Sequence, residues 1–91
     1  MHETSVLIEK PNIAQLKALN VFHWPIWEKE VSAFEWIYEE RETCWLLEGE
    51  VTVTTSEGSV SFGKGDLVIF PKGLHCTWDI KQAVKKHYQF G

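Results

Sequence analysis

The carboxylate, thiol and imidazole groups in the second half of this sequence are the side chains that could take part in chemistry. Glu42 and Cys44 stand two residues apart, Cys76 lies further along, and His87 comes close to the end. Thiolate, imidazole and carboxylate are the groups that bind zinc and other transition metals. A carboxylate among aromatic side chains could instead orient a small polar ligand. Metal binding and ligand binding are therefore the two chemistries to compare.

The spacing of these residues predicts that several of them share one face. Successive side chains of a strand point to opposite faces, so residues 42, 44 and 46 lie together, as do residues 76 and 78. If Glu42 faces the interior of a barrel, then Cys44, Leu46, Cys76 and Trp78 line that interior too. We expect the two cysteines to be free, buried and apolar in behaviour, because two cysteines do not make a disulfide framework.

The elements that position these residues are one short helix and a series of short strands. In "KPNIAQLKALN", Asn12 and Gln15 form a predicted capping box, which places a helix at about 12–19. Apolar alternation and Gly or Pro turns predict strands at 32–38, 44–47, 51–55, 59–62, 67–70, 75–80 and 84–90, with a turn or bulge at Glu48-Gly49. Roughly seven or eight short strands with frequent turns are typical of an all-β sandwich or barrel.

Length and composition limit the organisation and the partners of the chain. The 91 residues predict a single domain over 1–91, with the barrel at about 21–90. Five Trp and five Phe in so short a chain predict that a partner subunit covers apolar surface, so we expect a homodimer. Trp24 and Trp27, which flank Pro25, are expected in that interface.

Charge and hydropathy exclude other classes. The net charge of −4 and the scattered Lys and Arg argue against nucleic acid as a partner. No stretch is apolar enough to span a membrane, and the N-terminus does not read as a signal peptide. We therefore expect a soluble intracellular protein, in the cytoplasm unless an organellar presequence has been removed. His2 and His23 belong to no group of candidate residues.

The order of these signals resembles the cupin superfamily. Its first motif ends in a glutamate, six residues and a glycine, as at Glu42 and Gly49; its second is a glycine, five residues and Pro-x-Gly, as at Gly65, Pro71 and Gly73. The stretches "WPIWEKEVSAFEW", "ETCWLLEG" and "KGDLVIFPKGLHCTW" are similar to small single-domain cupins related to the cupin domain of (S)-ureidoglycine aminohydrolases. The resemblance covers residues 21–90 and implies an all-β, jelly-roll-type cupin barrel with one short N-terminal helix.

The resemblance also implies a metal site, from which this sequence departs. Metal-binding cupins place two histidines, one residue apart, three or four residues before the glutamate; here those positions hold either Trp36 and Tyr38 or Glu35 and Ile37. The histidine of the second motif is replaced by Cys76. Of the expected ligands only Glu42 is kept, so the metal site is degenerate. The cofactor is unknown, and a divalent metal could be held only by Glu42, Cys76 and an inward-pointing His87.

We therefore expect a protein that binds a small polar metabolite in an aromatic-walled pocket. The predicted lining comprises Trp36, Tyr38, Glu42, Cys44, Cys76, Trp78 and His87. Glu42 could equally be a structural carboxylate, paired with a lysine or hydrogen-bonded to Tyr38.

Two enzymatic alternatives remain open. The similarity to ureidoglycine aminohydrolases implies a metal-dependent enzyme acting on a small nitrogenous or carbonyl substrate. The second alternative is a metal-free sugar epimerase or isomerase, for which His87 and Tyr38 are the candidate base and acid. The sequence does not decide whether the protein is an enzyme.

Overall fold

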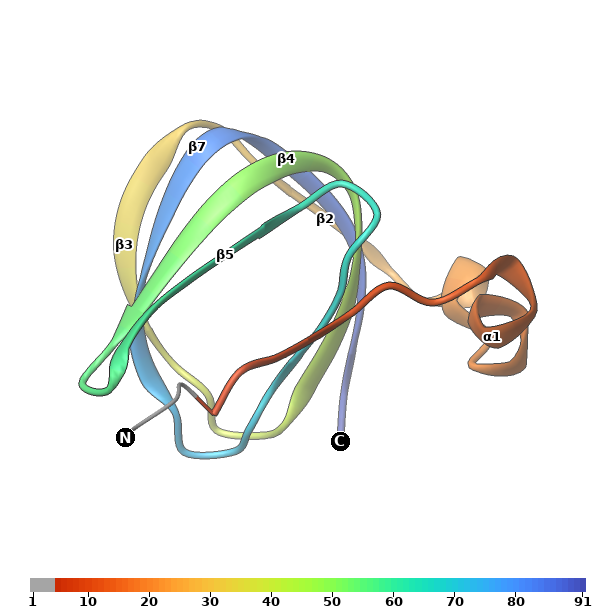
Figure 1. The fold of residues 1–91 in the computed structure, drawn as a ribbon, viewed down its shortest axis with the longest axis horizontal. Helices are drawn as coiled ribbons and strands as arrows, with labels where there is room; N and C mark the ends of the chain where they lie inside the picture. The colour runs from red at the N-terminus through yellow and green to blue at the C-terminus, as the bar shows by residue number, and fades with distance from the viewer. Residues whose placement is uncertain (1–4) are drawn as a thin grey trace.

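A single antiparallel sheet of seven strands curls into a barrel in the computed structural model, which describes residues 5–91 (Figure 1). The elements in chain order are β1 (Leu7–Glu9), α1 (Ile13–Ala18), η1 (Val21–His23), β2 (Ile26–Lys29), β3 (Ser32–Ile37), β4 (Glu42–Thr55), β5 (Gly58–Gly63), β6 (Leu67–Phe70) and β7 (His75–Phe90). The predicted all-β barrel with one short N-terminal helix is confirmed. His2 lies outside the described residues.

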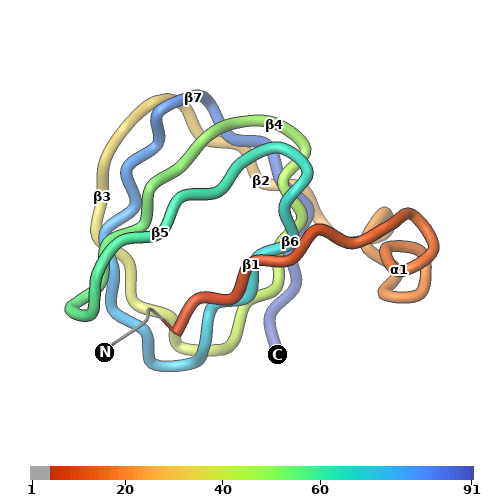
Figure 2. Tube along the Cα trace, viewed as in Figure 1, coloured from red at the N-terminus to blue at the C-terminus, as the bar shows by residue number. Residues whose placement is uncertain are grey.

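Strand β7 connects most of the sheet. It pairs with β4 on one side, and on the other side with β3 over its first half and with β2 over its second half. Strands β5 and β6 both pair with β4, and β1 pairs with β6 (Figure 2). Residues from most of the chain therefore reach the same barrel interior.

Strands β4 and β7 are longer than the sequence predicts. We predicted two separate strands in each of these regions, whereas β4 runs unbroken over Glu42–Thr55 and β7 over His75–Phe90. The expected bulge near Gly49 is present, with register shifts between residues 46 and 51. Across it, the buried residues of β4 change from even numbers (42, 44, 46) to odd numbers (51, 53). Strand β7 buries even-numbered residues on both halves, and His87 in addition.

The barrel core contains a cluster of packed aromatic rings. The Phe70 ring stacks on Tyr38 with centroids 4.7 Å apart, and Phe62 meets Trp78 edge to face at 5.6 Å. Cys44 and Cys76 are both free and buried, as predicted. Leu46 and Trp78 are buried in the same core, which agrees with the expected face of β4 and β7.

Helix α1 projects from the side of the barrel (Figure 1). The Asn12 side chain accepts from the Gln15 backbone N–H, and the Gln15 side chain accepts from the Asn12 N–H, so the predicted capping box is present. Lys10, which precedes the helix, is ion-paired with Asp66 at 2.5 Å. Among residues 5–91, no helix has the length and apolar character needed to cross a membrane.

Candidate functional site

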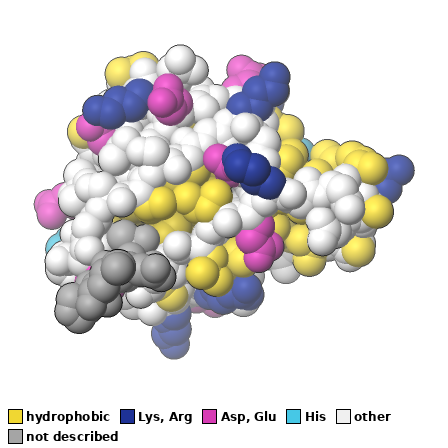
Figure 3. Space-filling view, in the orientation of Figure 1, with side chains coloured by type: hydrophobic (Ala, Val, Ile, Leu, Met, Phe, Trp, Pro, Cys, Tyr) yellow, Lys and Arg dark blue, Asp and Glu magenta, His cyan; other side chains and the backbone are white. Residues whose placement is uncertain are grey.

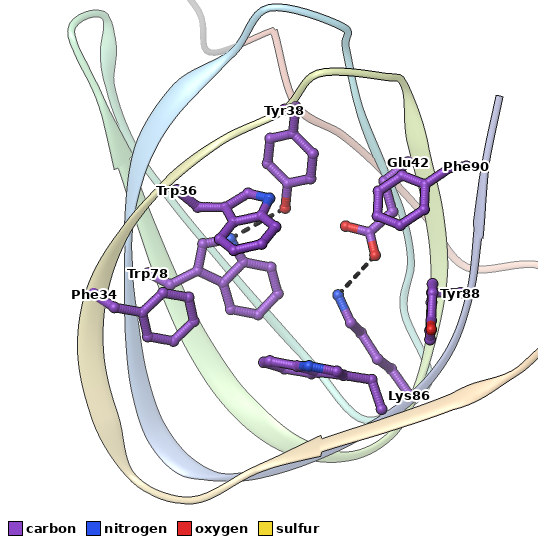
Figure 4. Close-up of a pocket in the computed structure, with 9 residues that line it drawn as sticks. Phe34, Trp36, Tyr38, Glu42, Trp78, Lys86, Tyr88 and Phe90 are labelled. Atoms are coloured by element: carbon purple, nitrogen blue, oxygen red, sulfur yellow. Dashed lines mark hydrogen bonds and ion pairs between the residues drawn. The ribbon is translucent and has the colours of Figure 1, made fainter.

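A cavity of about 220 Å³ lies inside one end of the barrel (Figure 4). Aromatic rings make up most of its wall, and two charged side chains complete it. The lining residues are Trp27, Phe34, Trp36, Tyr38, Glu42, Trp78, Lys86, Tyr88 and Phe90.

Solvent exposure separates the mouth of the cavity from its floor. Trp36 and Phe90 are 47% and 43% exposed, so they form the mouth. Tyr38, Glu42, Trp78 and Lys86 are all buried, at 5% exposure or less, and we call these four residues the floor. Charged side chains are rarely buried unless they are paired, so the two charges of the floor require an explanation.

Glu42 and Lys86 form an ion pair across the floor. Lys86 Nζ donates to Glu42 Oε2 at 2.9 Å, and Figure 4 shows the two side chains end to end. Glu42 begins β4, and Lys86 lies on the second half of β7, opposite Leu46 in the register of the sheet. Both strands bring even-numbered residues inward here, which is why the two side chains meet.

Two tryptophans enclose the Lys86 ammonium. Nζ lies 4.9 Å from the ring centroid of Trp27 and 4.7 Å from that of Trp78. The negative face of an aromatic ring attracts a cation, and more strongly when water is excluded. Together with the Glu42 carboxylate, these rings hold the ammonium in a fixed place.

Tyr38 completes the floor as a neutral hydrogen-bonding group. Its hydroxyl oxygen accepts from Trp78 Nε1 at 3.2 Å. Burial, followed by the nearby Glu42 charge, raises the pKa of the Tyr38 hydroxyl far above its usual value. The hydroxyl therefore stays protonated and can donate to a ligand or to water in the cavity.

The cavity contains four of the seven predicted pocket residues: Trp36, Tyr38, Glu42 and Trp78. Cys44 and Cys76 lie in the core and are not among the lining residues. His87 is also outside the lining; its Nδ1 is 2.9 Å from the backbone oxygen of Trp24, and its ring meets Phe22 edge to face. It follows Lys86 on β7 and is therefore directed to the opposite face of the strand.

The predicted metal ligands are not brought together. Within residues 5–91, no group of three or more His, Cys, Asp or Glu side chains is arranged to hold a metal ion. Glu42 has an ammonium as its partner, and His87 is engaged with the backbone near β2. The residues present therefore do not fit a cupin metal, and the lysine pairing that we considered for Glu42 is the one observed.

Sequence reasoning missed Lys86, Trp27, Phe34, Tyr88 and Phe90 as lining residues. The sequence does not identify Lys86, because it predicts a separate strand at 84–90, and a break between strands leaves the inward face of the second one undetermined. Had residues 75–90 been read as one strand, the even numbering of Cys76 and Trp78 would have placed Lys86, Tyr88 and Phe90 on the inner face. Trp27 contacts Trp78 and Lys86 within the chain, and its expected place in a subunit interface stays a prediction.

The floor has hydrogen-bonding capacity beyond its own ion pair. An ammonium has three donors and a carboxylate has about four acceptor sites, whereas one bond joins the two groups. The rings around them favour a flat molecule by stacking. The arrangement can therefore bind and orient a small molecule that has both a donor and an acceptor.

Comparisons with known proteins agree with this architecture. The family model described as the EutQ-like cupin domain matches residues 16–88. A solved DUF861 family protein from Thermotoga maritima is 55% identical, with 96% of this chain and 100% of that chain covered and a TM-score of 0.93. A comparison with curated proteins found no match.

More distant structures share the fold alone. The EutQ protein of Clostridium difficile is 17% identical, with 94% of this chain and 68% of that chain covered and a TM-score of 0.67. A DUF861 family protein of unknown function from Pseudomonas syringae pv. tomato is 24% identical, with 72% of this chain and 29% of that chain covered and a TM-score of 0.66. Identity this low carries no information about activity.

Proposed function

This chain belongs to the family of EutQ-like cupin domains, and we propose that it binds a small polar molecule in the aromatic-walled cavity at the end of its barrel. The prediction of a cupin from the two motifs is confirmed by the family match. The observation that supports a binding role is the Glu42–Lys86 ion pair on the cavity floor, where side-chain exposure is only 5% and 6%.

A buried ion pair is a poor way to stabilise a barrel. Removing two charges from water costs several kcal/mol per ion, and well-packed apolar residues of the same volume often stabilise as well or better. The pair nevertheless lies where a cavity opens, beside groups with hydrogen-bonding capacity to spare. Recognition of a ligand gives the pair a role that packing does not.

The wall of the cavity supports the same role. Phe34 stacks on Trp78 with an interplanar angle of 14°, and Trp27 meets both rings edge to face, so the rings are fixed by one another. Fixed rings lose little conformational entropy when a ligand binds. Most ligand sites combine an apolar wall with a few placed polar groups in this way.

No specific observation favours either enzymatic alternative. The resemblance to (S)-ureidoglycine aminohydrolases remains a prediction from the motifs, and the described residues provide no metal ligand set for such a reaction. An epimerase would need His87 and Tyr38 at one site, but His87 is not among the residues that line the cavity with Tyr38.

The five tryptophans allow a direct test by NMR. Trp27, Trp36 and Trp78 line the cavity, whereas Trp24 and Trp45 do not, so their indole N–H signals separate cavity binding from surface binding. The signals would be assigned with single Trp→Phe variants, and the protein titrated with a library of small aromatic alcohols, amides, acids and amines. We expect hits that shift the cavity signals selectively. Hits that shift only Trp24 or Trp45, or no hits at millimolar concentration, would contradict the proposed function.

A further inference from the structure

The two floor charges also limit which ligand class fits, an inference that rests on the proposed function. Glu42 and Lys86 neutralise each other at 2.9 Å, so the floor has no net charge to offer. A carboxylate ligand that approaches Lys86 meets the Glu42 carboxylate beside it. A cationic ligand that approaches Glu42 meets the Lys86 ammonium. Either would bring a third, unbalanced charge into a site removed from water, which is unfavourable.

Lys86 cannot readily move aside to accommodate a charged ligand. Its ammonium lies over the rings of both Trp27 and Trp78 while it donates to Glu42. Displacing it would forfeit two cation–π contacts as well as the ion pair. The built-in cation thus occupies the place that a ligand ammonium would need.

Carboxylates around the mouth also disfavour anionic ligands, although more weakly than the floor does. A groove that shares Trp36 and Phe90 with the cavity is also lined by three carboxylates and one imidazole, those of Glu35, Glu39, Glu40 and His75, and His75 lies 3.5 Å from Glu35. These exposed carboxylates disfavour anions at low salt, and salt screens the effect. Raising the ionic strength therefore weakens the effect of the carboxylates at the mouth and leaves the discrimination by the floor.

An uncharged ligand with an adjacent donor and acceptor matches the floor. A carbonyl oxygen can accept one of the remaining Lys86 N–H groups, while a neighbouring N–H donates to Glu42, and the original pair stays intact. The aromatic wall selects a flat shape, and a cavity of about 220 Å³ is smaller than a typical drug-sized pocket.

We propose that the cavity selects small, flat, uncharged molecules with an adjacent carbonyl and N–H, such as primary amides and lactams, over carboxylates and amidinium cations of the same shape. The discrimination arises from the Glu42–Lys86 pair as a unit, and not from either residue alone.

Benzamide, benzoate and benzamidine test this proposal, because they have nearly the same shape and differ in charge. Each would be titrated into the full chain at neutral pH and at low and moderate salt, with the indole N–H signals of Trp27, Trp36 and Trp78 followed by NMR. We expect benzamide to bind the wild type on the order of tenfold more tightly than either charged probe, as one charge-assisted hydrogen bond would give. The preference should persist at moderate salt.

Replacement of Glu42, of Lys86 or of both tests whether the ion pair causes the preference for benzamide. Glu42→Gln leaves the ammonium unpaired and should shift the preference to benzoate, whereas Lys86→Met leaves the carboxylate unpaired and should shift it to benzamidine. The double variant Glu42→Gln/Lys86→Met buries no charge and keeps the protein testable if a single variant fails to fold. In the double variant benzamide should bind about tenfold more weakly than in the wild type, because the Lys86 ammonium and the Glu42 carboxylate are gone, while both charged probes stay weak because the site still excludes water.

The outcomes separate this inference from the proposed function. Tighter binding of benzoate or benzamidine by the wild type, or an affinity for benzamide that is unchanged in the double variant, would overturn the ligand class and leave the cavity as a binding site. If none of the three probes shifts the cavity signals of the wild type, the inference is contradicted, and the proposed function is contradicted as well if the wider library also leaves those signals unchanged.

Discussion

Glu42 and Lys86 are the residues whose replacement tells most about the site, because each leaves the other buried without a partner. Removing one member of a buried pair is strongly destabilising, whereas replacing both members is often neutral. The two Trp rings over Lys86 and the open cavity moderate the first effect, since they offer the ammonium other interactions. Stability and ligand preference can therefore be measured on the same set of variants.

We predict that Glu42→Gln lowers the free energy of unfolding by up to about 3–5 kcal/mol, and that the double variant Glu42→Gln/Lys86→Met recovers most of that loss. Urea unfolding at neutral pH measures both. The exposed pair Lys81–Asp79 provides the control, since Asp79→Asn should change stability by less than about 1 kcal/mol. A double variant as unstable as the single one would show that the pair contributes to stability.

The cysteines lead to a prediction about reactivity. Burial raises the pKa of the Cys44 thiol to about 12 and of the Cys76 thiol to about 11, from the usual value of 9.0, and the Glu42 charge adds to both shifts. Because the thiolate is the reactive form, neither cysteine of the folded protein should react with Ellman's reagent at mildly alkaline pH. Both should react in denaturant, and rapid labelling of Cys76 in the native protein would contradict the structure.

The same pKa shifts make stability depend on alkaline pH. Both thiols hold their protons more tightly in the folded chain than in the unfolded chain. Their contribution to stability is therefore fully present below pH 9.0 and is lost as the pH rises through about 11 and about 12. Urea midpoints should fall over that range, and less steeply in Cys44→Ser. An equally steep fall in that variant would assign the effect to other groups.

At the scale of elements, the bulge in β4 determines which residues face inward. Gly49 has φ +113°, and a Cβ built there would lie 2.8 Å from the Ala83 backbone oxygen and 2.9 Å from the Val84 Cα. Both contacts involve the backbone of β7, which cannot give way without moving the strand that carries Lys86. The bulge and the cavity floor are thus linked through β7.

Gly49→Ala should therefore destabilise the barrel more than a glycine replacement elsewhere. Gly58 is the matched control, because it has φ +136° but nothing within 4 Å of its Cβ position. Gly58→Ala should cost about 1–3 kcal/mol for the backbone strain alone. Gly49→Ala should lose a further 1–3 kcal/mol or so through overpacking. Equal unfolding free energies in the two variants would show that β7 can move aside.

The elements also show how far the sequence could predict the structure. The glycines and prolines marked the turns, and the two motifs identified the fold, because these features depend on local backbone geometry. The inward face of Glu42, Cys76 and Trp78 followed from alternation within single strands. The Glu42–Lys86 pair could not be predicted in this way, because it depends on β7 running unbroken through residues 81–83 and on its register with β4.

At the scale of the whole molecule, the distribution of apolar side chains bears on assembly. Helix α1 and the 3-10 helix η1 form an arm that projects from the barrel, on which Ile13, Leu19 and Phe22 are exposed. Figure 3 shows hydrophobic side chains at the surface of this arm. Ile37 and Val31 are exposed on the barrel. We propose that a homodimer covers part of this surface, since apolar area favours association when it is removed from water.

Light scattering coupled to size-exclusion chromatography tests the proposed dimer. The expected mass is twice the 10.6 kDa of the chain, at micromolar concentration and in moderate salt. Replacement of Phe22 by Ser would then show whether the arm takes part, with Val31→Ser as the matched exposed control. A mass of one chain at every concentration would contradict the dimer.

The pairing of β7 has a consequence for biosynthesis. Strands β2 and β3 take their hydrogen-bonding partner from β7, the last strand of the barrel, and β4 pairs with β7 along one edge and with β5 and β6 along the other. A ribosome adds about 5–20 residues per second, so for seconds the nascent chain presents these strands, with their tryptophans, without the edge that closes them. The barrel therefore cannot close until β7 has emerged. Its yield in the cell should consequently depend on the chaperones that shield unpaired strands until the final segment of the barrel has been made.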